Sequence, residues 1–210
     1  MLKWGIVQVL TSSLRDRELP ANEFRRTTHR LSTLLWEFVL SHERASYVQT
    51  PRRVEHRAYT AYALPRDRFA VATILRAGES MLSSNILYDS GDFTFVKLLI
   101  RRAPNGYAVS DIPLPPNLAG KVVFLADNML ATGGAVLNAM RILLGGGVKE
   151  ENVRLVTLFA AKRGIEAVRK AHPAVRIFTC SSREDLNAHN YLVPGIGDYG
   201  DRFYNTPHLI

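Results

Sequence analysis

A lone carboxylate followed by a pair of glycines is the strongest chemical feature of the chain. Residues 122–135 run from an apolar segment to Asp127, pass through a short turn with Thr132, and continue through Gly133 and Gly134 into helical apolar spacing. Glycines let the backbone approach a ligand closely, and the N–H groups that open a helix face an anion. A carboxylate at a strand end suits sugar hydroxyls or a metal-bound diphosphate. The stretch therefore predicts a site for a phosphorylated sugar.

Buried strands that alternate with helices are expected to position this site. Ligands bind beyond the carboxyl ends of the strands in a parallel α/β sheet, and Arg76, Asp127 and Thr132 all fall at such ends. We expect Asn22 to cap the first helix and 104–106 to form a hairpin or loop. Apolar runs and spacing predict strands at 69–75, 93–100, 122–126, 153–159 and 175–179, helices at 22–45, 79–89, 134–144 and 163–171, an irregular arm at 51–65 and an irregular tail at 186–206.

Composition excludes several classes of protein. The chain has 210 residues, a net charge of +8 and one cysteine. No apolar run has the length of a membrane span, and the N-terminus lacks the apolar core of a signal peptide. One cysteine, Cys180, excludes an internal disulfide and is expected to pack in the core, so we predict a cytoplasmic protein. The positive charge favours anionic partners, although its arginines are scattered.

Four segments carry a resemblance to uracil phosphoribosyltransferases over nearly the full chain. They are 74–81 (Ile-Leu-Arg-Ala-Gly-Glu-Ser-Met), 114–116 (Leu-Pro-Pro), 127–134 (Asp-Asn-Met-Leu-Ala-Thr-Gly-Gly) and 191–203, which ends the base-binding tail. The segment 76–81 and the aromatic Tyr199 are more similar to eukaryotic members of the family. The resemblance implies a type I phosphoribosyltransferase fold: an N-terminal helix and arm (1–65), a core (66–185) and a small C-terminal hood (186–210).

The activity that the resemblance implies joins uracil to 5-phosphoribosyl 1-diphosphate (PRPP), giving UMP and diphosphate by direct displacement at ribose C1′. Asp127 would accept hydrogen bonds from the ribose hydroxyls, and Arg76 would face the diphosphate. A second arginine is expected at Arg102, with Arg101 as the alternative. The PRPP site implied in full is Arg76, Arg102, Asp127, Asn128, Met129, Leu130, Ala131, Thr132, Gly133, Gly134, Ala135 and Asp198.

The resemblance also assigns the base site and the partners. Uracil would meet backbone groups of Leu192, Gly197 and Tyr199, with Asp198 beside them. Mg²⁺ would be bound through the substrate, and no dedicated protein metal site is predicted. A homodimer or larger homo-oligomer is expected, GTP is a possible activator, and no membrane or nucleic-acid partner is expected. No role is assigned to the six histidines.

Three departures from the family pattern bear on activity. Ala135 stands where Ser or Thr is usual, which removes one phosphate-facing hydroxyl, and Asn128 stands where Pro is common. The segment 103–111 is shorter and lacks the usual acidic pair. Three alternatives therefore stay open: a site for another pyrimidine base, a weak or silent homologue that binds uracil or UMP, and an RNA-binding pyrimidine regulator on the same fold.

Overall fold

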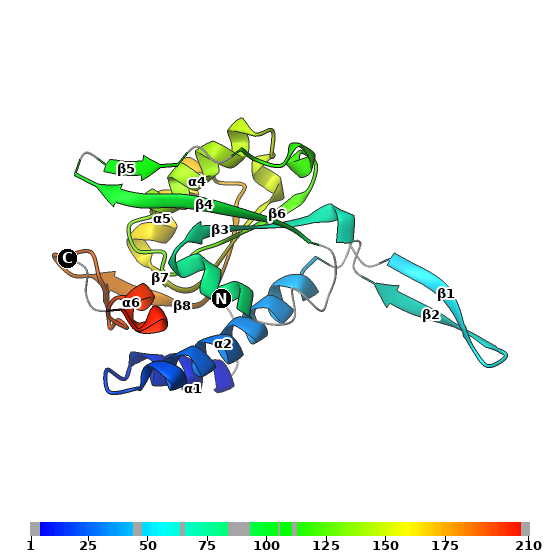
Figure 1. The fold of residues 1–210 in the computed structure, drawn as a ribbon, viewed down its shortest axis with the longest axis horizontal. Helices are drawn as coiled ribbons and strands as arrows, with labels where there is room; N and C mark the ends of the chain where they lie inside the picture. The colour runs from blue at the N-terminus through cyan, green and yellow to red at the C-terminus, as the bar shows by residue number, and fades with distance from the viewer. Residues whose placement is uncertain are drawn as a thin grey trace.

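The chain folds around a mostly parallel sheet that helices cover on both faces (Figure 1). The computed structural model describes residues 5–43, 48–63, 66–83, 93–104, 106–110 and 113–206. Within them the helices are α1 (Gly5–Arg15), α2 (Ala21–Ser41), α4 (Gly134–Gly145), α5 (Lys162–Ala171) and α6 (Tyr199–Tyr204). The sheet contains β3 (Phe69–Leu75), β4 (Thr94–Ala103), β5 (Gly106–Val109), β6 (Val122–Ala126), β7 (Val153–Ala161), β8 (Arg176–Leu186) and β9 (Leu192–Val193).

The strand order is β5-β4-β3-β6-β7-β8-β9. The pairs between β4 and β8 are parallel, and the edge strands β5 and β9 pair antiparallel with β4 and β8. This arrangement confirms the predicted α/β fold with a mostly parallel central sheet. It also brings the carboxyl ends of β3, β4, β6 and β7 to one edge, where the sequence places Arg76 and Asp127.

Alternating side chains of the central strands feed two separate cores. In β6, Phe124 and Ala126 join the cluster under α1, α2 and α6, whereas Val123 and Leu125 join the cluster under α4 and α5. Because both faces are covered, these strands are apolar throughout rather than alternating. The strands expected at 69–75 and 122–126 are thus confirmed, and the other predicted strands are present with longer ends.

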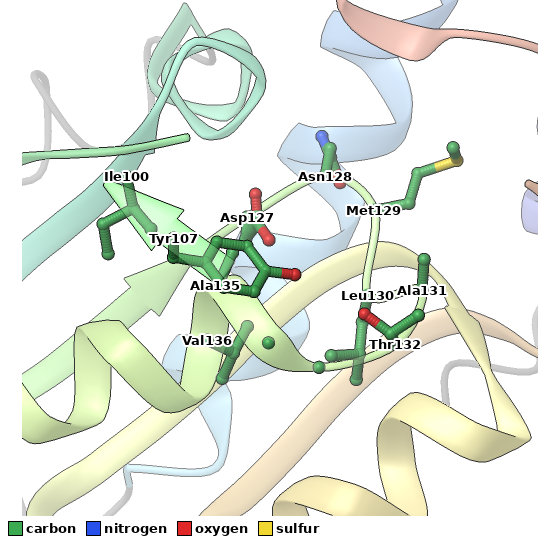
Figure 2. A pocket seen from close by; sticks show the side chains of 12 residues that line it. Ile100, Tyr107, Asp127, Asn128, Met129, Leu130, Ala131, Thr132, Ala135 and Val136 are labelled. Carbon is green, nitrogen blue, oxygen red and sulfur yellow. The ribbon is translucent and has the colours of Figure 1, made fainter. Parts of the chain in front are cut away.

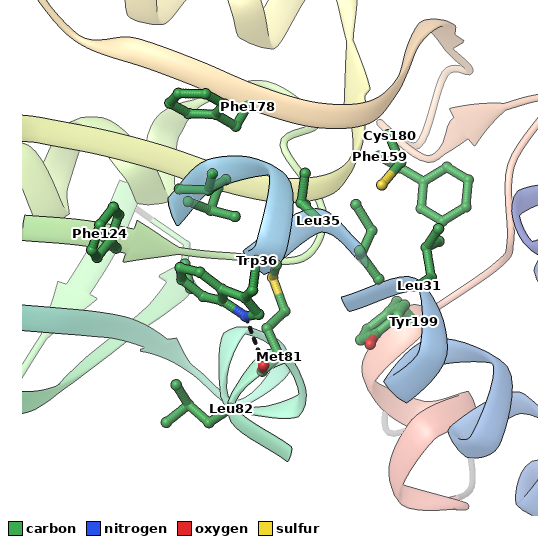
Figure 3. Packing of buried hydrophobic residues seen from close by; sticks show 14 of the residues in the cluster. Leu31, Leu35, Trp36, Met81, Leu82, Phe124, Phe159, Phe178, Cys180 and Tyr199 are labelled. Carbon is green, nitrogen blue, oxygen red and sulfur yellow. Dashed lines mark hydrogen bonds between the residues drawn. The ribbon is translucent and has the colours of Figure 1, made fainter. Parts of the chain in front are cut away.

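Helix α2 covers one face of the sheet with an aromatic contact at its centre. Trp36 is fully buried, meets Phe124 edge to face at 5.7 Å between ring centroids, and donates its indole N–H to the carbonyl of Met81 at 2.9 Å (Figure 3). Cys180 lies in the same core, and burial raises the pKa of its thiol to about 12. A thiol with that pKa stays neutral near pH 7, so the predicted packing role of Cys180 is confirmed.

Several local expectations were wrong. Helix α2 begins at Ala21, with Pro20 rather than Asn22 at its N-cap. The expected irregular arm contains an antiparallel hairpin, β1 (Val48–Val54) with β2 (Arg57–Ala63), which projects from the body (Figure 1). The tail contains β9 and α6, because pairing with β8 and packing on α2 order a segment that has no strong pattern of its own.

Two further expectations concern ends of elements. Residues 77–83 form a 3₁₀ helix rather than the start of an α-helix, and 84–89 lie outside the described residues. The helices expected at 134–144 and 163–171 are confirmed to within one residue, as is the 104–106 hairpin turn between β4 and β5, in which residue 105 is not described. None of the described helices is long and apolar enough to cross a membrane.

Candidate active site

Two cavities lie side by side at the carboxyl edge of the sheet. The smaller, about 180 Å³, is lined by residues 127–136 together with Ile100 and Tyr107 (Figure 2). The larger, about 510 Å³, lies between this loop, Arg76 and the C-terminal tail. Ile100, Asn128, Met129 and Ala131 line both cavities, so the two form one continuous region.

The smaller cavity has the features of an anion site. Gly133 adopts a left-handed conformation with φ of +88°, and α4 begins at the next residue. No side chain caps the start of α4, so the N–H groups of its first turn are available to a ligand. The hydroxyl of Thr132 lies on the loop at the mouth of this turn (Figure 2). Backbone donors, a helix start and a hydroxyl together suit a phosphate group.

Neighbouring elements hold the loop in place. The N–H of Leu130 donates to the carbonyl of Phe159 at 3.1 Å, and the N–H of Ala161 donates to the carbonyl of Leu130 at 2.8 Å. Gly164, in the first turn of α5, packs against the loop so closely that a Cβ there would lie 2.5 Å from the carbonyl oxygen of Ala131. The cradle is therefore formed before a ligand arrives, which lowers the entropic cost of binding.

Asp127 is the carboxylate at the end of β6, and it is 8% exposed. Burial raises the pKa of its carboxyl from 3.8 to about 7, while a hydrogen bond from the N–H of Asn128 acts in the opposite direction. The ligand-free protein thus keeps a carboxyl that ionises near neutral pH beside the phosphate-binding loop. A ligand that donates hydroxyl hydrogen bonds favours the charged form of that carboxyl.

The raised pKa makes stability depend on pH. From about pH 4 to about pH 7 the folded protein keeps the Asp127 proton that the unfolded chain has lost. The free energy of unfolding therefore falls as pH rises through this interval and is level above it. We expect Asp127→Asn to exceed the wild type in thermal stability by a margin that grows between about pH 5 and about pH 7, up to about 4 kcal/mol.

Thermal unfolding of ligand-free protein at a series of pH values measures this margin. Asp67→Asn is the matched control, because Asp67 is exposed and lies away from both cavities. A margin for Asp127→Asn that does not change with pH would show that the carboxyl is already ionised in the folded protein at low pH.

Arg76 connects the end of β3 to the C-terminal tail. Its Nη2 donates to Asp201 Oδ1 at 2.8 Å and its Nη1 to Thr206 Oγ1 at 3.4 Å, while its carbonyl accepts from the hydroxyl of Tyr204 at 3.0 Å. The side chain is 50% exposed and lines the larger cavity. The contacts with Asp201 and Thr206 use two of the five guanidinium N–H donors, so α6 positions Arg76 without using all of them.

A buried polar network connects the tail to the phosphate-binding loop. Tyr199 is 2% exposed, and its hydroxyl lies 2.6 Å from Ser80 Oγ. Ser80 Oγ also accepts from Asn128 Nδ2 at 3.5 Å, and Asn128 Oδ1 accepts from the N–H of Leu158 at 2.9 Å. Burial raises the pKa of Tyr199, so its hydroxyl stays neutral. Asn128, a departure from the family pattern, thus tethers the two cavities to each other.

The structure brings together nearly all of the residues that the sequence singled out. Every predicted residue from Asp127 to Ala135 lines the smaller cavity, and Arg76, Leu192, Gly197, Asp198 and Tyr199 line the larger one. Asp198 caps α6 by accepting from the N–H of Asp201 at 2.9 Å. Arg102 lies in β4, but its side chain lies outside the described residues; Arg101 is exposed. The roles assigned to these residues stay predictions.

Sequence reasoning missed several lining residues. Tyr107 belongs to the altered segment 103–111, which matches no motif, so nothing local marked it. His189, expected to be a surface histidine, is exposed but lines the larger cavity, and Tyr191 flanks the recognised tail motif. Further lining residues that sequence reasoning did not assign are Ala77, Ile100, Val136, Asn190 and Gly200.

The fold and the two cavities define a class of protein: a phosphoribosyltransferase of the type I fold, with a phosphate-binding loop after a central strand. The family model described as uracil phosphoribosyltransferase matches residues 1–206. The chain therefore belongs to the uracil phosphoribosyltransferase family.

Individual relatives agree with this assignment. A uracil phosphoribosyltransferase from Deinococcus radiodurans is 35% identical, with 98% of this chain and 97% of the relative covered. Uracil phosphoribosyltransferase 2 from the yeast Schizosaccharomyces pombe is 34% identical, with 94% and 90% covered. The solved structure of the AQ2163 protein from Aquifex aeolicus superimposes with a TM-score of 0.85 at 27% identity, covering 97% of this chain and 96% of that one.

Proposed function

We propose that this protein is a uracil phosphoribosyltransferase that converts uracil and PRPP into UMP and diphosphate in pyrimidine salvage. The observation that carries the proposal is the continuity of the two cavities: a phosphate-binding loop with Asp127 at its start opens into a second cavity closed by the C-terminal tail. Membership of the family supplies the base and the donor. The cavities offer one place for a phosphorylated ribose and an adjoining place for a planar base.

The phosphate-binding loop holds the donor substrate in this proposal. The first N–H groups of α4 and the hydroxyl of Thr132 bind the 5′-phosphate of PRPP. Asp127 accepts hydrogen bonds from the ribose 2′- and 3′-hydroxyls, and its negative charge stabilises positive charge that develops at C1′. Both interactions come from contiguous residues, so their relative positions are set by the path of one loop.

The reaction needs no protein nucleophile. Uracil N1 forms a bond to C1′ as the bond from C1′ to the diphosphate oxygen breaks, the electron pair leaves with diphosphate, and the N1 proton passes to solvent. Arg76 neutralises charge on the departing diphosphate, with Arg102 as the second cation. Catalysis then consists of positioning and charge stabilisation.

Mg²⁺ fits this site as a companion of the diphosphate. Among the described residues no group of three or more His, Cys, Asp or Glu side chains is placed to hold a metal ion. When bound, Mg²⁺ supplies positive charge to the diphosphate. Asp198, which lines the larger cavity beside Arg76, is the carboxylate that we propose to face it.

The tail provides base recognition. We propose that backbone groups of Leu192, Gly197 and Tyr199 pair with the edge of uracil that carries O2, N3–H and O4. A backbone N–H aimed at O4 would reject cytosine, because its amino group would leave that donor unpaired. The buried Tyr199 side chain packs on Phe203 at 6.0 Å between ring centroids, which anchors the tail while leaving its backbone for the ligand.

The decisive experiment incubates the protein with labelled uracil, PRPP and Mg²⁺ and measures UMP. We expect UMP to form with uracil and little nucleotide to form with cytosine. No UMP under any condition, with uracil still bound in a direct binding assay, would favour a silent uracil-binding homologue. RNA binding that weakens steeply with added salt would instead favour a regulator.

The assembly and regulation expected from the family are also proposals. The hairpin of β1 and β2 projects from the body and exposes Val54 at 61% and Tyr59 at 48%. We propose that it takes part in a homodimer or larger homo-oligomer, which light scattering in solution would measure. GTP activation would appear as a rise in the UMP rate when GTP is added. The cytoplasmic location stays a prediction.

A further inference from the structure

Tyr107 reaches the phosphate-binding loop from a different part of the chain. It lies in β5, where the hairpin after β4 pairs Tyr107 with Arg102. A Cβ at Gly134 would lie 2.4 Å from the Tyr107 hydroxyl oxygen and 2.5 Å from its Cε2, so the phenol ring rests directly on the Gly134 backbone. Figure 2 shows the ring over the start of α4, beside Ala135.

The hydroxyl of Tyr107 is available to a ligand. The side chain is partly buried and lines the smaller cavity. Within the described part of the chain no hydrogen bond to this hydroxyl is present, whereas the buried Tyr199 hydroxyl has its partner in Ser80. A phenol that points into a polar cavity without a protein partner can donate to an anion there.

The cavity has few other side-chain donors. Of the residues that line it, only Thr132 and Tyr107 carry hydroxyls, and the oxygen and nitrogen of the Asn128 amide are directed to Leu158 and Ser80. Position 135 contributes only a methyl group next to the phenol. A phosphate at the start of α4 would thus meet one hydroxyl from its own loop and one from the β5 hairpin.

We propose that the Tyr107 hydroxyl donates a hydrogen bond to the phosphate of the substrate bound at the start of α4, and so replaces the hydroxyl that Ala135 lacks. This inference rests on the proposed function, because it assigns a further residue to the same phosphate site. It also gives the altered segment 103–111 a role: the hairpin positions a donor over the cradle that the loop by itself leaves incomplete.

Binding of ribose 5-phosphate by calorimetry, together with steady-state kinetics, tests the proposal. A hydrogen bond to a charged group is worth about 1.5–3 kcal/mol, so Tyr107→Phe is expected to weaken ribose 5-phosphate binding and raise the KM for PRPP by about tenfold or more. The KM for uracil should change little. Adding Ala135→Ser to Tyr107→Phe should recover most of the loss, whereas Ala135→Ser in the wild type should have a small effect.

The controls separate the hydroxyl from the ring and from the reaction. Tyr59→Phe removes one hydroxyl from an exposed tyrosine of the β1–β2 hairpin and should bind like the wild type. Unchanged ribose 5-phosphate binding in Tyr107→Phe, or a loss that Ala135→Ser does not repair, would overturn the proposal. A wild type that makes no UMP would count against the proposed function, and the ribose 5-phosphate comparison would still decide on Tyr107.

Discussion

Asp127→Asn is expected to lower the rate of UMP formation by about 100- to 1000-fold while uracil binding stays close to that of the wild type. The substitution keeps the size of the side chain and an oxygen that can accept the N–H of Asn128. It removes the negative charge next to the ribose, where the transition state develops positive charge. The groups proposed to bind uracil lie in the larger cavity, which Asp127 does not line.

The measurement pairs single-turnover UMP formation with direct uracil binding. Asp67→Asn removes an exposed carboxylate outside both cavities and should keep wild-type values in both assays. Equal losses in rate and in uracil binding would contradict the role given to Asp127. The expected effect is large because the carboxylate is buried, where charge interactions are poorly screened.

Gly195→Ala is expected to abolish most uracil binding and leave the phosphate-binding loop intact. A Cβ at Gly195 would lie 1.8 Å from the carbonyl oxygen of Leu192, so the backbone between them must move. Leu192 is one of the residues whose backbone is proposed to contact uracil. A displacement of this kind costs about 3 kcal/mol, which corresponds to about a 100-fold loss of affinity.

Calorimetry with uracil and with ribose 5-phosphate separates the two cavities. Gly145→Ala is the matched control, because a Cβ there has no atom within 4 Å and Gly145 lies at the far end of α4. We expect ribose 5-phosphate to bind Gly195→Ala within about twofold of the wild type, well inside one tenfold step of about 1.4 kcal/mol. Loss of ribose 5-phosphate binding as well would show that the tail and the loop form one cooperative unit.

The fold was largely predictable because its signals are local. Continuous apolar runs at 69–75 and 122–126 indicate strands buried on both faces, and the structure confirms them. The β1–β2 hairpin and α6 were not predicted. Neither segment has strong alternation or helical spacing, and α6 depends on its packing against α2.

The phosphate-binding loop could be located from sequence because its residues are contiguous: Asp127, Thr132 and Gly133 occupy one cavity whatever the rest of the chain does. The tertiary structure alone decides three other properties. The pKa of Asp127 depends on how much of the fold buries it, and the contact of Arg76 with Asp201 depends on where the tail returns. Tyr107 lies on Gly134 because the hairpin after β4 folds over α4. Such contacts join segments that are distant in sequence, so sheet order and packing set them, and no local pattern records them.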